Sequence, residues 1–163
     1  MKTGIYYGSA TGTTAEIARR IASMTGVSDA DIHDVADTAP HTAGDYDLLI
    51  LGSSTWGNGE LEDDWYDFLD GLRALDLTGK KIALFGCGDE TMSDTFCNAV
   101  GILYDRLKDT GATFIGEFPA DEYHFDKSAA SDGAVMRGLL LDEVNHPELT
   151  TARLRRWTEL IKS

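Results

Sequence analysis

Basic residues are scarce in this sequence. The 163 residues include 14 Lys and Arg against 28 Asp and Glu, which gives a formal net charge of −14. Such an acidic surface repels nucleic-acid phosphates and anionic lipid headgroups, so we exclude nucleic-acid and membrane binding as functions. The same charge favours solubility and encounters with basic partners.

Cysteines and long apolar runs are scarce as well. Cys87 and Cys97 are too few for a disulfide scaffold, do not form a CxxC motif, and make no zinc-type cluster with the four histidines. The N-terminus lacks the apolar stretch of a signal peptide, and no segment approaches the roughly 20 apolar residues of a membrane span. We therefore expect a cytoplasmic protein without a metal site.

Short apolar runs alternate with helical patterns along the chain. The continuous runs at residues 48–51 and 82–85 are typical of strands buried on both faces of a parallel sheet. The pattern predicts an α/β fold: a doubly wound, five-stranded parallel sheet in the order 2-1-3-4-5, with helices on both faces, in one domain spanning residues 1–163. The expected strands are residues 4–7, 32–35, 46–52, 81–86 and 113–118, and the expected helices are residues 14–24, 63–75, 94–110 and a last one after Pro147.

In such a sheet, ligands bind beyond the carboxyl ends of the strands. Three predicted loops lie there, at residues 8–14, 52–62 and 86–94, and we expect them to converge. The first loop leads into a helix, whose free amides and dipole favour an anion such as a phosphate. It has no lysine and does not match GxxxxGK[ST] or GxGxxG, so a nucleoside triphosphate is excluded, while an ordinary capped turn stays open as the alternative.

The second loop carries a tryptophan between polar and glycine residues, Thr55-Trp56-Gly57, which offers a flat face for an aromatic ligand. The third loop, Gly86-Cys87-Gly88, lets backbone approach a ligand closely. A phosphate, a stacking ring and polar backbone together indicate a mononucleotide with a large planar head.

The sequence resembles the flavodoxins. The motifs that carry the resemblance follow one another in order along nearly the whole chain: Ser9-Ala10-Thr11-Gly12-Thr13-Thr14, Thr55-Trp56-Gly57-Asn58-Gly59-Glu60-Leu61, Asp63-Asp64-Trp65, Gly86-Cys87-Gly88-Asp89, Phe96-Cys97, Gly111-Ala112-Thr113, Tyr123-His124-Phe125 and Leu141-Asp142-Glu143. The irregular stretch at residues 119–137 is similar to the insertion that interrupts the fifth strand in long-chain members.

The resemblance implies a cofactor, flavin mononucleotide (FMN), bound without a covalent link. Carried over residue by residue, it implies that the phosphate lies on Ser9, Ala10, Thr11, Gly12, Thr13 and Thr14, the isoalloxazine on Ser54, Thr55, Trp56, Gly57, Asn58 and Gly59, and the pyrimidine edge on Cys87, Gly88 and Asp89. Many relatives carry a tyrosine over the outer flavin face, which is missing here. Met92 is our candidate for that cover, and a gap-filling role beside the helix is the equal alternative.

The resemblance further implies a function. The chain would be a low-potential one-electron carrier and not an enzyme, cycling between neutral semiquinone and anionic hydroquinone. It would receive electrons from a flavodoxin reductase, NADPH-dependent or similar, and pass them to acceptor enzymes with basic surfaces; we expect a monomer. An FMN-dependent quinone reductase of similar fold and a phosphate-loop signalling module are the alternatives. A quinone reductase would need an acid–base pair near the loops, and we find none there. The tryptophan Trp56, flanked by glycine, argues against a signalling module.

Two features would change the relative stability of the flavin's oxidation states. The Gly57–Asn58 peptide tolerates positive φ, so its carbonyl can turn to accept a hydrogen bond from the reduced flavin N5. The acids around the site would disfavour the anionic hydroquinone, each by about 0.4 kcal/mol at ~10 Å. They are Glu60, Glu62, Asp63, Asp64, Asp89 and Glu90. A soluble acidic rim is the simpler reading of the same residues.

Overall fold

The computed structural model describes residues 2–8, 12–56, 60–89, 91, 96–119, 123, 128–132 and 135–162, and of Trp56 it describes only the backbone. The strands are β1 (Thr3–Gly8), β2 (Ile32–Asp34), β3 (Leu48–Trp56), β4 (Glu60–Leu61), β5 (Lys81–Cys87), β6 (Thr113–Ile115), β7 (Phe118–Pro119), β8 (Val135–Met136) and β9 (Leu139–Leu141). The α-helices are α1 (Thr13–Thr25), α2 (Trp65–Arg73), α3 (Asn98–Leu107) and α4 (Pro147–Lys162), with 3₁₀ turns η1 (Asp29–Asp31) and η2 (Pro40–Asp45).

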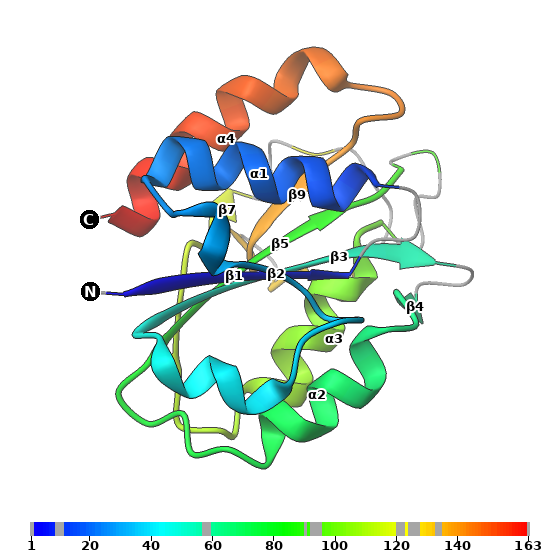
Figure 1. Cartoon of the computed structure of the whole chain (residues 1–163). Coiled ribbons are helices and arrows are strands. Elements are labelled where there is room, and N and C mark those ends of the chain that lie inside the picture. The colour runs from blue at the N-terminus through cyan, green and yellow to red at the C-terminus, as the bar shows by residue number, and fades with distance from the viewer. Residues whose placement is uncertain are drawn as a thin grey trace.

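A mostly parallel sheet forms the middle layer. Its order is β2-β1-β3-β5-β6, which is the predicted 2-1-3-4-5 arrangement in the numbering of the observed strands. The predicted fold class is thus confirmed. Figure 1 shows α1 and α4 over one face of the sheet and α2 and α3 over the other.

The edge beside β5 is made of two separate strands, β6 and β9. β6 pairs with the first part of β5, up to Ile115 opposite Ala83, and β9 pairs with the last part, from Leu139 opposite Phe85. Gly116, at φ +82°, turns the chain away from β5 after β6. The predicted strand at residues 113–118 therefore ends early, and β7 pairs instead with β8 in a separate antiparallel ribbon.

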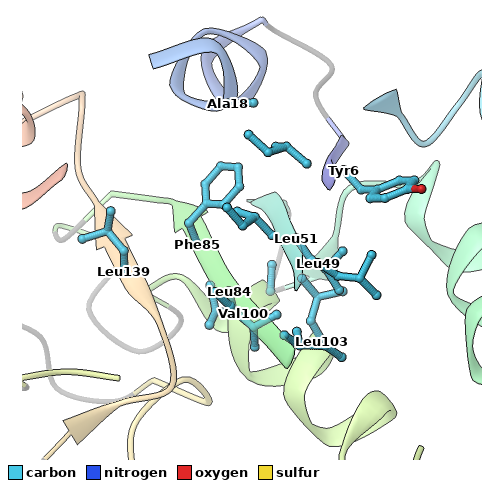
Figure 2. Close-up of a cluster of buried hydrophobic side chains, with 14 of the residues drawn as sticks. Tyr6, Ala18, Leu49, Leu51, Leu84, Phe85, Val100, Leu103 and Leu139 are labelled. Carbon is cyan, nitrogen blue, oxygen red and sulfur yellow. The ribbon is translucent and has the colours of Figure 1, made fainter. Parts of the chain in front are cut away.

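The central strands are buried because both of their faces carry helices. Leu49, Leu51 and Leu84 are completely buried. Figure 2 shows Phe85 on the side of Ala18 from α1, while Val100 and Leu103 from α3 lie beside the leucines of the other face. This two-sided burial explains why both strands read as unbroken apolar runs.

Candidate functional site

Residues from the start of α1 and from the ends of β3 and β5 meet at one edge of the sheet. The Thr14 hydroxyl, in the first turn of α1, lies 3.2 Å from the Ser54 hydroxyl of β3. Ser54 is opposite Cys87, the last residue of β5, in the parallel pairing of β3 and β5, and burial raises the pKa of the Cys87 thiol while Thr14 lowers it. The structure thus brings together one residue from each of the three loops that the sequence analysis expected to converge.

The start of α1 has a geometry that suits an anion. Gly12, at φ +90°, precedes the helix, and its carbonyl accepts a hydrogen bond from the Glu16 amide at 3.0 Å. Glycine has no side chain to cap the helix, and a Cβ built on Gly12 would meet no atom within 4 Å. The first amides of a helix have no partner within the helix, so Thr13 and Thr14 present theirs at an uncrowded end. This end fits a phosphate group.

The second predicted loop is partly regular structure. β3 continues through Ser53, Ser54 and Thr55 to Trp56 instead of ending near Gly52, and β4 folds back against it, with Thr55 opposite Leu61. The Thr55 hydroxyl accepts a hydrogen bond from the Ala99 amide in α3 at 3.1 Å. The pair of strands is therefore held against α3 at Thr55.

Glu62, one of the acids expected around the flavin edge, is buried instead. It is 5% exposed, and its Oε2 accepts a hydrogen bond from the Asp64 amide at 3.1 Å. Its own amide donates to the buried Ser53 hydroxyl. Burial raises the pKa of Glu62. This carboxyl supports the β4–α2 turn and does not belong to the charged surface.

The loop after β5 is anchored on the strand beside it. The Gly88 amide donates to the Leu141 carbonyl of β9 at 2.9 Å, and a Cβ at Gly88 would come within 2.8 Å of Cys97 Sγ. Asp89 accepts hydrogen bonds from the Thr91 hydroxyl and amide, and one from Asn145 at 2.6 Å. Those donors, the Thr91 side chain above all, lower the pKa of Asp89 and keep it ionised.

The cysteines offer no reactive group. Cys87 and Cys97 are both buried free thiols. Burial raises the pKa of Cys87 to about 12. A thiol in such a setting is a small packing residue. Within the described ranges, no group of three or more His, Cys, Asp or Glu side chains is placed to hold a metal ion.

The flavodoxin family model matches residues 5–157 of the chain. Flavodoxin 1 of Salmonella typhimurium is 41% identical over 163 residues, covering 99% of this chain and 93% of that protein. The chain belongs to the flavodoxin family. Flavodoxin 1 of Escherichia coli is 42% identical over 161 residues, covering 98% of this chain and 92% of the relative.

Solved flavodoxin structures agree with this membership. A crystal structure of Fusobacterium nucleatum flavodoxin bound to flavin mononucleotide is 31% identical and has a TM-score of 0.90, covering 99% of this chain and 98% of that one. Flavodoxins bind FMN and are electron-transfer proteins, not enzymes. The quinone reductase and signalling alternatives thereby lose their support.

Part of the predicted flavodoxin site lies outside the described residues. These positions are Ser9, Ala10, Thr11, Gly57, Asn58, Gly59, Met92 and the side chain of Trp56. Of the rest, the structure brings together Thr14, Ser54 and Cys87, and Gly12, Thr13, Thr55, Gly88 and Asp89 are their neighbours along the chain. It adds Asn145, which the sequence analysis missed because its partner Asp89 is 56 positions away.

Among the segments that the structure describes, no helix is both long and apolar enough to cross a membrane. The longest helix, α4, has 16 residues and carries both acidic and basic side chains.

Proposed function

We propose that this chain binds FMN at the ends of β1, β3 and β5 and works as a low-potential one-electron carrier. The contact of Thr14 with Ser54, which is itself paired with Cys87, carries the proposal, because the helix end that suits a phosphate then lies beside the two loops expected around the ring. Membership of an FMN-binding family supports the same assignment.

FMN supplies the redox chemistry, and we propose that it cycles here between the neutral semiquinone and the anionic hydroquinone. The chain's own part is to hold and bias it. The amides of Thr13 and Thr14 would bind the phosphate, Trp56 would stack on the ring, and Gly88 and Asp89 would contact its pyrimidine edge. The Gly57–Asn58 peptide would turn its carbonyl toward N5, and Met92 would cover the outer face.

Surface charge would steer the partners. With a net charge of −14, the chain would attract a reductase and acceptor enzymes through basic surfaces. We propose a cytoplasmic monomer, which the two buried reduced thiols support. We also propose that residues 119–137 are the insertion of a long-chain flavodoxin; support comes from the pairing of β6 and β9 with successive parts of β5.

Flavin titration tests the proposal. The flavin-free protein should quench FMN fluorescence with one site per chain. Two charge-assisted hydrogen bonds to the phosphate are worth about 3 kcal/mol, so FMN should bind about a hundredfold more tightly than riboflavin. Equal affinities would remove the phosphate site at α1, and no binding of either flavin would remove the proposed function.

Anaerobic reduction tests the carrier role. The yellow holoprotein should turn blue on partial reduction, and absence of a blue species would refute the hydrogen bond at N5. Trp56→Ala should weaken FMN binding and raise the hydroquinone potential, because an electron-rich ring face no longer opposes the anion. An unchanged potential would rule out stacking by Trp56.

A further inference from the structure

Asn145 ties the loop after β5 to the turn between β9 and α4. Its Nδ2 donates to Asp89 Oδ1 at 2.6 Å and to Asp142 Oδ2 at 2.8 Å. Asp89 follows β5 and Asp142 follows β9, so one side-chain amide joins the ends of two neighbouring parallel strands. We call this arrangement, Asp89–Asn145–Asp142, the amide bridge.

The turn holds Asn145 firmly. Asp142 is completely buried, and its Oδ1 accepts hydrogen bonds from the amides of Val144 at 3.0 Å and Asn145 at 2.8 Å. Asp142 thus fixes both the backbone and the side chain of Asn145. A side chain held in this way reaches its second partner without further loss of rotamer freedom.

The chemistry of the bridge requires a primary amide. Asp89 and Asp142 present carboxylates, which repel each other and accept hydrogen bonds but do not donate them when ionised. The NH₂ group of asparagine has two donors, one for each carboxylate, and it is neutral and short. Serine and threonine have a single donor, and aspartate would add a third negative charge.

The bridge acts on the part of the site that would face the flavin ring. Cys87 is still paired with Leu141 of β9 and Ser54 of β3, and the Gly88 amide donates to the Leu141 carbonyl. The amide bridge adds an attachment further along the loop, at the Asp89 side chain. It therefore extends the part of the loop that is held in place from Gly88 to Asp89.

We propose that Asn145 is a positioning residue of the flavin site, which acts through Asp89 to hold residues 87–89 against the ring and takes no part in phosphate binding. This inference rests on the proposed function. It predicts a specific pattern: loss of the bridge weakens binding of the isoalloxazine, and the phosphate end is unaffected.

The test compares two flavins and four variants of the full chain: Asn145→Ala, Asp89→Ala, the double variant, and Val144→Ala. The last is the matched control, because Val144 lies in the same turn with a 70% exposed side chain and enters the turn through its backbone amide. Dissociation constants for FMN and riboflavin are measured by fluorescence quenching, and the stability of each flavin-free variant by urea unfolding.

Asn145→Ala should weaken FMN and riboflavin by the same factor, about tenfold, which is the loss of one hydrogen bond to a charged group. Val144→Ala should bind both flavins like the parent. In the Asp89→Ala background, Asn145→Ala should weaken flavin binding by less than about a further twofold, because the partner of Asn145 is already missing. Asn145→Ser, with one donor for two acceptors and good turn propensity, serves if the alanine variant unfolds, and should show the same equal losses.

Three results would overturn the inference: loss of FMN affinity with riboflavin affinity unchanged, full additivity of the two alanine substitutions, or a fall in stability with both affinities intact. The last would make Asn145 a turn residue only. Failure of the parent chain to bind either flavin would instead refute the proposed function, so the two failures are distinguishable.

Discussion

The substitution Gly101→Ala has two opposing effects on stability. It improves helix propensity in α3, and it disturbs the packing of residues 128–130 on that helix. Gly101 lies in α3, where alanine is favoured over glycine by about 1 kcal/mol. A Cβ at this position, however, would lie 2.2 Å from the carbonyl carbon and oxygen of Ala129. Carbon atoms in contact are about 3.5–4 Å apart, so the backbone of Ala129 would have to retreat by more than about 1 Å.

That retreat would break the contacts that dock this segment on α3. The Ala129 amide donates to Asn98 Oδ1 at 2.7 Å, and the Ser128 hydroxyl donates to the Phe96 carbonyl. Each hydrogen bond contributes about 1 kcal/mol, and the completely buried Ala130 would be uncovered as well. The losses exceed the gain in propensity, so we expect a net destabilisation of about 1–2 kcal/mol.

Thermal and urea unfolding of the flavin-free protein measure the effect. The melting temperature should fall by about 4 °C. Gly44→Ala is the control, because a Cβ there would meet nothing within 4 Å, and it should change stability by less than about 0.5 kcal/mol. A rise in stability of about 1 kcal/mol for Gly101→Ala would mean that propensity alone decides, and that residues 128–130 do not pack on α3.

Three further predictions concern charge and reactivity. Burial raises the pKa of Glu62, so the folded state binds a proton that the unfolded chain has released, and stability is lost as the pH rises above about 4.5. The stability of Glu62→Gln relative to the parent should therefore increase from about pH 4 to about pH 7. The same stability difference at both pH values would contradict the raised pKa. Because Cys87 has a pKa of about 12 and Cys97 is completely buried, a thiol reagent at about pH 8 should modify neither until the chain unfolds, and a fast stoichiometric reaction of the folded protein would contradict this. Electron transfer to a basic haem protein should slow by about tenfold or more between low salt and ~0.5 M salt, and a flat rate would remove electrostatic steering.

The order of the sheet could be predicted because it follows from patterns within short stretches of the sequence. The buried strands β3 and β5 carry unbroken apolar runs, and helical patterns with apolar stripes separate the predicted strands. The edge strand β2 was also expected at its observed place, residues 32–34 within the predicted 32–35. Right-handed crossovers then leave few arrangements, of which the doubly wound one suits five strands.

The lengths of the strands at the site depend on partners far along the chain. Residues 53–55 are serine and threonine and resemble a loop, but Ser53 and Ser54 pair with Gly86 and Cys87 of β5, which extends β3. Likewise, apolar Phe118 was assigned to the fifth strand, although Gly116 redirects the chain before it. The composition of these short stretches does not indicate which of these strand pairings forms.

Single polar contacts between distant segments could not be predicted at all. Asn145 has no periodicity, motif or charge to distinguish it from any other turn residue. Only the fold brings it beside Asp89. The burial of Glu62 is a similar case, because a run of acids suggests a solvated surface and its neighbours Asp63 and Asp64 fit that description.

The division of the outer strand into β6 and β9 has a consequence for engineering. Ile115 is opposite Ala83 and Leu139 is opposite Phe85, so the two pieces are separated along β5 by a single position, a gap of about 6.6 Å from Cα to Cα. One residue spans that distance. Along the chain, 23 residues separate Ile115 from Leu139, although these two residues lie close together beside β5. A very short link could therefore close this edge of the sheet, so the segment matters for the side chains that it buries, among them Phe118, Ala130 and Met136, and not for the continuity of the strand.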